Sequence, residues 1–210
     1  MSMKYAFVGF GDLGKQFFNL INPSNSDEVI YFDDNLEIDF IKTFPFNFYE
    51  DNCFDEFSFV VSLGYKHLEI KNRIINNLTI NKRNIHTCIH NSAHVCKTAT
   101  IGNGVMIYPL ACIDFQVHID DGVLINNNVV ISHESKIGRC TYISPGVILS
   151  GKVTIGENCF VGSGSIISND VSIGENVFIG IGSVVTRNIN DNAYVIGNPL
   201  RKLDKKFNLK

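Results

Sequence analysis

The chain lacks a strong excess of charge of one sign, and this limits its partners. It carries 18 lysine and arginine residues against 21 aspartate and glutamate residues, a formal net charge of −3. A balance this even provides no basic field to hold nucleic acid or an anionic membrane surface. The sequence also lacks the run of roughly 18 apolar residues that a membrane-spanning helix needs. We therefore expect no nucleic-acid partner and no membrane insertion.

Two further absences concern compartment and metal. The N-terminal residues MSMKYAFVGFGDLG pass from a short apolar stretch directly into glycines, without the apolar core and cleavage site of a signal peptide. None of the six cysteines forms a CxxC pair, which makes a zinc site unlikely. We expect a cytoplasmic protein with reduced thiols and no metal. With 210 residues, 45% of them hydrophobic, the chain is long enough to bury a sizeable core.

A six-residue repeat occupies the C-terminal half. Every sixth residue from Ile89 to Val185 is aliphatic, at 17 consecutive positions of which 13 are isoleucine. No helix has this period. Each repeat is predicted to form a short strand and a corner, with three repeats to a triangular coil and a stacked aliphatic column inside. Glycine often follows the aliphatic residue, as at Gly138 and Gly156, where we expect it to supply the positive φ of a tight corner.

The repeats T-I-G-E-N-C, S-I-G-E-N-V and T-I-G-N-G-V resemble those of the hexapeptide-repeat acyltransferases. The resemblance implies a left-handed parallel β-helix and a homotrimer, although parallel crossovers in general favour the right hand. The stretches K-Y-A-F-V-G-F-G-D-L-G, Y-F-D-D, V-V-S-L-G-Y, C-I-H-N-S-A and Y-V-I-G-N-P-L-R-K are similar to one subgroup. It contains nucleotide-amino-sugar N-acetyltransferases of the bacillosamine and viosamine type and proteins like sialic-acid O-acetyltransferase. This implies acetyl-CoA as co-substrate and a UDP- or dTDP-linked 4-amino-4,6-dideoxyhexose as acceptor, in O-antigen, capsule, lipopolysaccharide or glycan biosynthesis.

The first 85 residues begin like a nucleotide-binding domain. Gly9, Gly11 and Gly14 form G-x-G-x-x-G between a predicted strand and a predicted helix, and a second strand ends at Asp33 and Asp34. The segment is too short for the two halves of a dinucleotide fold, which favours a single nucleotide. A purely structural tight turn remains the alternative.

The resemblance assigns functional roles to residues of this segment and sets the domain limits. It places Gly11, Asp12 and Leu13 at the diphosphate and nucleoside, Asp33 and Asp34 at the base or ribose, and Gly64 and Tyr65 in the pocket wall. The predicted organisation is a small α/β, Rossmann-like nucleotide-sugar-binding domain over 1–85, a left-handed parallel β-helix of hexapeptide repeats over 86–190, and a C-terminal cap over 191–210.

His133 is the catalytic candidate. It follows the inward Ile131 by two places, so it points away from the core, and Glu134 is adjacent. The stretch N-N-N-V-V-I-S-H-E-S-K-I-G resembles the family's catalytic segment, in which the histidine is the general base and the acid orients it. An imidazole can take the proton that an amine loses as it attacks a thioester, with no covalent enzyme intermediate. The alternative is an incidental exposed His-Glu pair.

The resemblance also implies a binding groove for acetyl-CoA. It runs along the coil edges and is formed by Gly151, Ser163, Gly164, Ile181 and Gly182, with an oxyanion-binding backbone N–H near Gly151. Arg187 and Arg201–Lys202 are candidates for the CoA phosphates, or are ordinary surface charges. The chain departs from the family at Tyr142, where members often carry a second histidine near the thioester.

Four other functions are alternatives to N-acetylation. Sugar O-acetylation could use the same histidine, so the sequence barely separates it from N-acetylation. A zinc carbonic anhydrase on a β-helix is disfavoured because no second histidine lies near His133 in the central coils. A non-catalytic repeat scaffold is disfavoured by the His133–Glu134 pair. A sugar nucleotidyltransferase would need a much larger N-terminal domain.

Overall fold

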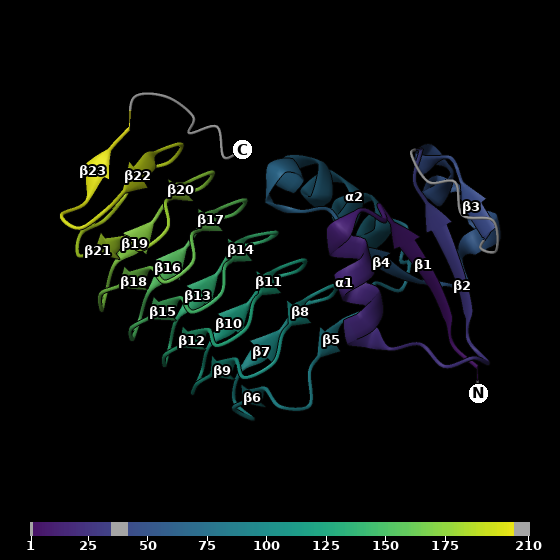
Figure 1. The fold of residues 1–210 in the computed structure, drawn as a ribbon, viewed down its shortest axis with the longest axis horizontal. Helices are drawn as coiled ribbons and strands as arrows, with labels where there is room; N and C mark the ends of the chain where they lie inside the picture. Colours follow the sequence, from purple (N-terminus) through teal and green to yellow (C-terminus); the bar gives the residue numbers. More distant parts are fainter. Residues whose placement is uncertain (1, 35–41, 204–210) are drawn as a thin grey trace. The chain divides into compact units, whose positions relative to one another are not determined.

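The computed structural model describes residues 2–34 and 42–203. The chain divides into two compact units, Met1–Cys88 and Ile89–Lys210 (Figure 1). Of the cap predicted over 191–210, residues 204–210 lie outside the described part. None of the helices in the described ranges is long and apolar enough to cross a membrane.

The first unit is built on a small parallel sheet. Its four strands, in the order β3-β2-β1-β4, are all parallel, which is the order of the first four strands of the doubly wound nucleotide-binding sheet. The strands are β1 (Lys4–Val8), β2 (Glu28–Phe32), β3 (Lys42–Phe44) and β4 (Ser58–Val61). The helices are α1 (Asp12–Ile21) and α2 (Leu68–Ile80), with 3-10 turns η1 (Phe46–Glu50), η2 (Asn52–Phe54) and η3 (Tyr65–His67). Phe7, Phe32 and Phe59 are fully buried, as expected of strands covered on both faces.

The second unit is a parallel β-solenoid whose strands form three sheets. The eight-stranded sheet contains β5 (Cys88–Ile89), β8 (Met106–Ile107), β11 (Leu124–Ile125), β14 (Tyr142–Ile143), β17 (Phe160–Val161), β20 (Phe178–Ile179), β22 (Tyr194–Ile196) and β23 (Arg201–Lys202). The six-stranded sheet contains β6 (His94–Val95), β9 (Cys112–Ile113), β12 (Val130–Ile131), β15 (Ile148–Leu149), β18 (Ile166–Ile167) and β21 (Val184–Val185). The five-stranded sheet contains β7 (Thr100–Ile101), β10 (His118–Ile119), β13 (Lys136–Ile137), β16 (Thr154–Ile155) and β19 (Ser172–Ile173).

The predicted triangular coil is present. From β6 to β18, each strand pairs in parallel with the strand 18 residues on, as Ile131 pairs with Leu149; β20 pairs with β22 after 16 residues, and β22 with β23 in the antiparallel direction. The aliphatic repeat positions from Ile107 to Val185 point inward and are at most 2% exposed, and each contributes about 1.5–3 kcal/mol to the stability of the stack. Ile89, at the start of the repeat, is 43% exposed, so the buried column begins later than predicted.

The role predicted for the glycines was wrong. Gly138 and Gly156 do not have positive φ; that conformation falls two residues later, at Cys140 and Asn158. The glycines are needed because the coils stack closely. A Cβ at Gly138 would lie 2.6 Å from the carbonyl carbon of Gly156, and one at Gly156 would lie 2.7 Å from that of Gly174.

The small polar residues four places after the aliphatic ones join successive coils. The buried Thr141 hydroxyl donates to the carbonyl of Gly156 at 2.8 Å and accepts the N–H of Cys159 at 3.0 Å. The Cys159 thiol repeats this arrangement one coil on, with the carbonyl of Gly174 as its acceptor. Burial raises the pKa of this thiol to about 12. Each corner therefore satisfies polar backbone groups that would otherwise be buried without partners.

Candidate active site

His133 and Glu134 lie at the corner between β12 and β13, and both are exposed. The imidazole Nδ1 lies 3.1 Å from Glu134 Oε2. Glu134 occupies the left-handed corner position, with φ of 59°. When Nδ1–H donates to this carboxylate, Nε2 keeps its lone pair and can accept a proton. In the described ranges Nε2 has no hydrogen-bond partner, so the basic nitrogen is open.

Gly151, one coil further on, provides the surface against which the imidazole lies. A Cβ at this position would be 2.5 Å from His133 Nε2 and 2.6 Å from Cε1, so any side chain here would displace the ring. The N–H of Lys152 donates to the carbonyl of His133 at 2.9 Å, which fixes the two corners relative to each other. Gly151 is buried although His133 is exposed, consistent with a ring that covers the glycine.

The equivalent corners of the next coils lie along the same edge of the solenoid. Lys152 Nζ lies 4.0 Å from Glu134 Oε2, so the carboxylate also faces a positive charge. The N–H of Gly151 donates to Asn169 Oδ1 at 2.9 Å. The resemblance placed the oxyanion donor near Gly151, and this particular N–H is already engaged. Arg187 is exposed at the equivalent corner after β21, so His133, Gly151, Asn169 and Arg187 recur at 18-residue steps along one edge.

The other residues assigned to acetyl-CoA lie elsewhere on the solenoid. Ser163 and Gly164 form the corner between β17 and β18, and Ile181 and Gly182 the corner between β20 and β21. This is the opposite edge of the six-stranded sheet from His133. A single copy of the chain therefore does not bring these four residues together with His133 and Gly151.

Tyr142 lies on the outer face of the eight-stranded sheet, away from the His133 corner. Its ring packs on Phe160 at a centroid distance of 5.7 Å, and Phe178 and Tyr194 continue the column. Asn126 Nδ2 donates to the Tyr142 hydroxyl at 3.1 Å. The residue that departs from the family pattern is thus packed into an aromatic column.

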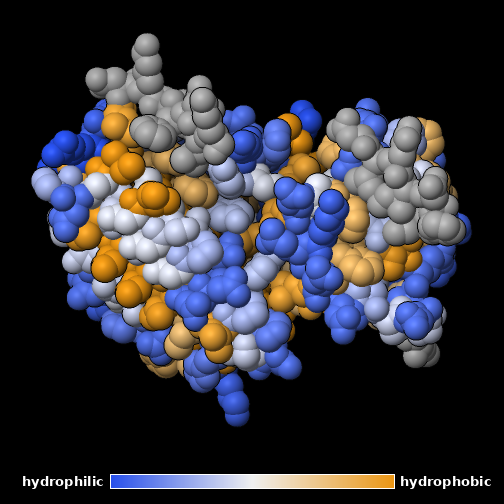
Figure 2. Space-filling view, in the orientation of Figure 1, coloured by the Kyte–Doolittle hydropathy of each residue, from blue (hydrophilic) through white to orange (hydrophobic). Residues whose placement is uncertain are grey.

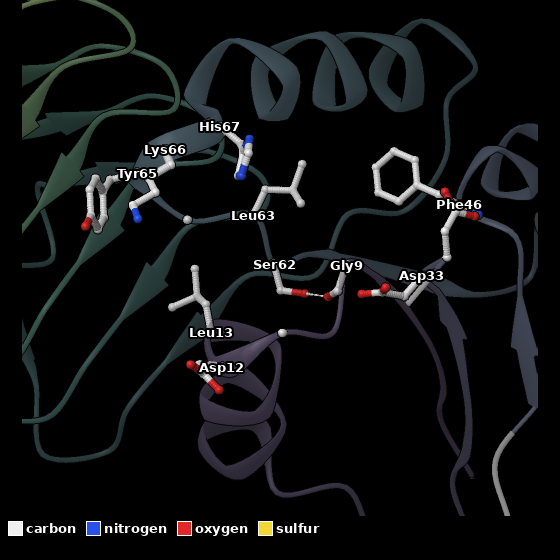
Figure 3. A pocket seen from close by; sticks show the side chains of 13 residues that line it. Gly9, Asp12, Leu13, Asp33, Phe46, Ser62, Leu63, Tyr65, Lys66 and His67 are labelled. Atoms are coloured by element: carbon white, nitrogen blue, oxygen red, sulfur yellow. Dashed lines mark hydrogen bonds between the residues drawn. The ribbon is translucent and has the colours of Figure 1, made fainter. Parts of the chain in front are cut away.

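The first unit contains a cavity of about 550 Å³ at the carboxyl ends of β1 and β4 (Figure 3). All seven residues that the resemblance assigned to the nucleotide line it. They are Gly11, Asp12, Leu13, Asp33, Asp34, Gly64 and Tyr65. Gly9, Phe46, Ser62, Leu63, Lys66 and His67 also line the cavity and were not assigned this role. The signal for Lys66 and His67 was their place directly after V-V-S-L-G-Y, where a helix begins.

The two acidic residues hold the loops of this cavity in place. Asp33 Oδ2 accepts the N–H of Phe10 at 2.7 Å, and Asp34 Oδ1 accepts the N–H of Phe46 at 2.8 Å. The Ser62 hydroxyl donates to the carbonyl of Gly9 (Figure 3). α1 begins next to Gly11, and η3, which leads into α2, begins after Gly64. The first N–H groups of a helix favour an anion, so this cavity can hold a phosphate or diphosphate.

Over residues 2–34 and 42–203, no group of three or more histidine, cysteine, aspartate or glutamate side chains is arranged to hold a metal ion. The other exposed histidine with a carboxylate partner is His118, whose Nε2 lies 2.9 Å from Asp120 Oδ1 on the outer face of the five-stranded sheet. Thr100 hydrogen-bonds the second nitrogen of that ring, so both nitrogens of His118 are engaged.

Comparison with known proteins gives one family match and several solved structures of the same fold. Residues 152–187 match the family model described as bacterial transferase hexapeptide (six repeats). The acetyltransferase domain of PglB from Neisseria gonorrhoeae, solved with acetyl coenzyme A, is 26% identical, with a TM-score of 0.86 over 97% of this chain and 100% of that one.

Two further structures share the fold at lower identity. Perosamine N-acetyltransferase from Caulobacter crescentus, solved with CoA and GDP-perosamine, is 20% identical, with a TM-score of 0.85 over 98% of each chain. WeeI from Acinetobacter baumannii is 18% identical, with a TM-score of 0.82 over 97% of this chain and 100% of that one. The resemblance found in the sequence is confirmed: the chain carries bacterial transferase hexapeptide repeats and is similar over nearly its whole length to the acetyltransferase domain of PglB.

Proposed function

We propose that this protein is an acetyl-CoA-dependent N-acetyltransferase that acts on a nucleotide-linked amino sugar. The observation that carries the proposal is the His133 corner, where Nδ1 is held by Glu134 and Nε2 is open above Gly151. The similarity to an acetyltransferase domain solved with acetyl coenzyme A supports the co-substrate. Such a function belongs in the cytoplasm, where acetyl-CoA and sugar nucleotides are available, and its product would enter bacterial glycan or lipopolysaccharide assembly.

In the proposed reaction the amino group attacks the thioester carbonyl carbon directly. His133 Nε2 takes the proton that the nitrogen loses as the C–N bond forms, and Glu134 stabilises the resulting imidazolium. Collapse of the tetrahedral intermediate breaks the C–S bond, and the imidazolium returns its proton to the departing thiolate. Imidazole is the side chain best suited to accept and return a proton at neutral pH.

The first unit is proposed to be a Rossmann-like domain that binds the nucleotide part of the acceptor. The starts of α1 and η3 both lie at its cavity. The charged and titratable side chains that line it are those of Lys66, His67, Asp12, Asp33 and Asp34. The helix starts and Lys66 suit the diphosphate, and the carboxylates are placed to accept hydrogen bonds from ribose or base. UDP and dTDP are the expected carriers. Because a structure of the same fold was solved with GDP-perosamine, GDP-linked amino sugars belong among the substrates to be tested.

We also propose a left-handed solenoid that assembles as a homotrimer through the outer face of the six-stranded sheet. This aliphatic face presents Val130, Ile148 and Ile166, which are 37%, 40% and 43% exposed. Figure 2 shows hydrophobic residues recurring along the solenoid surface. His133 and Gly151 lie on one edge of the face, and Ser163, Gly164, Ile181 and Gly182 on the other. Packing of neighbouring copies through this face would bring opposite edges together and complete the acetyl-CoA groove.

The test is an assay of acetyl-CoA consumption with UDP-, dTDP- and GDP-linked amino sugars and, as a hydroxyl acceptor, free sialic acid. We expect turnover with an amino-sugar nucleotide and a loss in kcat of about 10²–10⁴-fold in His133→Ala. His118→Ala is the matched control, because it removes another exposed histidine that has a carboxylate partner. Turnover of sialic acid alone, or equal activity in the two variants, would overturn the proposal.

A further inference from the structure

Several side chains of the solenoid hold a corner in place by accepting a backbone N–H from a neighbouring coil. The N–H of Asn103 donates to Asp121 Oδ1 at 2.7 Å, and the N–H of Glu175 donates to Asp191 Oδ1 at 2.9 Å. At the His133 corner the equivalent acceptor is the side chain of Asn169, which accepts the N–H of Gly151 at 2.9 Å. A carboxylate makes the stronger bond to a backbone N–H. Neutral side chains also serve as acceptors between coils, since Ser92 accepts the N–H of Leu110 and Asn188 that of Ser172. What sets Asn169 apart is its partner, because Gly151 is also the residue against which the His133 ring lies.

The bond to Gly151 fixes the orientation of the Asn169 side chain. A backbone N–H can only donate, so the carboxamide oxygen faces Gly151 and the NH₂ group is turned away from it. Within the described part of the chain Asn169 Nδ2 has no hydrogen-bond partner, and the residue is exposed. Asn169 and His133 both contact Gly151, Asn169 at its N–H and His133 on the side where a Cβ would stand. The NH₂ group of Asn169 is thus held in a fixed orientation with both N–H donors unused among the described residues. It lies next to Gly151, the same glycine that His133 Nε2 contacts.

We propose that Asn169 Nδ2 is the oxyanion donor of the acetyl transfer. This inference rests on the proposed function and assigns a catalytic residue to that same site. As the amine nitrogen attacks the thioester carbon and Nε2 of His133 takes its proton, the C=O electron pair moves to oxygen, where Asn169 Nδ2–H stabilises the negative charge. Reformation of C=O expels the thiolate, which takes the proton back from His133. The N–H of Gly151 contributes by holding the amide in this orientation.

The chemistry also explains why this corner is not capped by aspartate. A carboxylate at residue 169 could still accept the N–H of Gly151, but it would offer no donor and would place a negative charge beside the developing oxyanion. A neutral amide caps the corner and donates outward at the same time.

Asn169→Asp is the sharpest test, because it keeps the cap and removes the donor. We expect its melting temperature to stay near that of the wild type and its kcat to fall by about 10²–10³-fold. Asn169→Ala should lose kcat to a similar extent. Asp191→Asn makes the reverse exchange at a corner remote from His133 and should leave kcat unchanged. If Asn169→Ala keeps or gains kcat, the freed N–H of Gly151 is the donor and the inference is wrong.

A second measurement separates this inference from the proposed acceptor. The ¹³C chemical shift of the carbonyl in [1-¹³C]acetyl-CoA should move downfield on binding to the wild type, because Asn169 polarises the C=O bond, and should not do so in Asn169→Asp. This readout needs no sugar. An equal downfield shift in both proteins would overturn the role of Asn169 whatever the acceptor. Failure of the wild type to acetylate any amino sugar, with the shift difference present, would overturn only the proposed acceptor.

Discussion

Gly151→Ala should impair catalysis while leaving the fold intact. The added Cβ would lie 2.5 Å from His133 Nε2, where ordinary contacts begin at 3.4 Å, so the imidazole must retreat by about 1 Å. A displacement of about 1 Å at a reacting group can cost roughly 10²-fold in rate. Gly151 does not have positive φ, and the contacted atoms belong to a side chain that can rotate away. The melting temperature should therefore change little while kcat falls by about 10²-fold.

Gly156→Ala provides the opposite result at a neighbouring corner. Its Cβ would lie 2.7 Å from both the carbonyl carbon and oxygen of Gly174, which are backbone atoms and cannot rotate away. Overpacking of this kind costs about 1–3 kcal/mol, and the melting temperature falls by roughly 2–4 °C per kcal/mol in a chain of this size.

The two variants are compared by thermal denaturation and by steady-state acetylation at saturating acetyl-CoA. Gly156→Ala should lower the melting temperature and keep the kcat of the folded protein, whereas Gly151→Ala should do the reverse. If Gly151→Ala retains full kcat, the ring of His133 does not need the position seen here and the assignment of the corner is refuted.

Three further results are expected. Ile148→Asp places a charge in the centre of the aliphatic face and should prevent the proposed homotrimer from forming, so that light scattering reports monomers and activity is lost; an active monomer would contradict the proposed groove between copies. Asp33→Ala removes the carboxylate that accepts the Phe10 N–H at the edge of the cavity. The KM for the sugar nucleotide should rise by about 5–100-fold, since one lost hydrogen bond to a charged group is worth about 1–3 kcal/mol. An unchanged KM would count against the cavity as the nucleotide site. Burial raises the pKa of Cys159 from 9.0, and that of Tyr31 from 10.0, to about 12. In the folded state these two groups keep protons that they lose in the unfolded chain. Their contribution to the free energy of unfolding in urea should therefore be fully present just below about pH 9 and be lost between about pH 9 and 12; a flat profile between those values would show that these groups are not buried as described.

The sequence alone predicted the solenoid well because its period leaves few alternatives. A six-residue aliphatic spacing fits neither a helix nor an alternating strand, and 18 residues per coil follow from three repeats. The reason for the glycines could not be derived, because it depends on how closely Gly138 approaches Gly156 in the next coil. Spacing along the chain gives no measure of such contacts.

The candidate site was predictable in part. His133 and Glu134 are adjacent in the sequence, so their pairing needed only the outward direction that the repeat supplies. Asn169 lies 36 residues away from His133 and has no distinctive motif; only the observed bond to Gly151 connects them. Lys66 and His67 also line the cavity because the 3-10 turn Tyr65–His67 follows β4; their position after V-V-S-L-G-Y indicated the loop but not which of its side chains reach the cavity.

The most direct test of the central claim is the rate of acetyl transfer to an amino-sugar nucleotide by wild-type protein and by His133→Asn, measured at saturating acetyl-CoA. The account predicts that kcat of the variant is lower by at least about 10²-fold, because the asparagine side chain has no basic nitrogen to take the proton from the attacking amine. A variant with the wild-type kcat would contradict the assignment of His133 as the base.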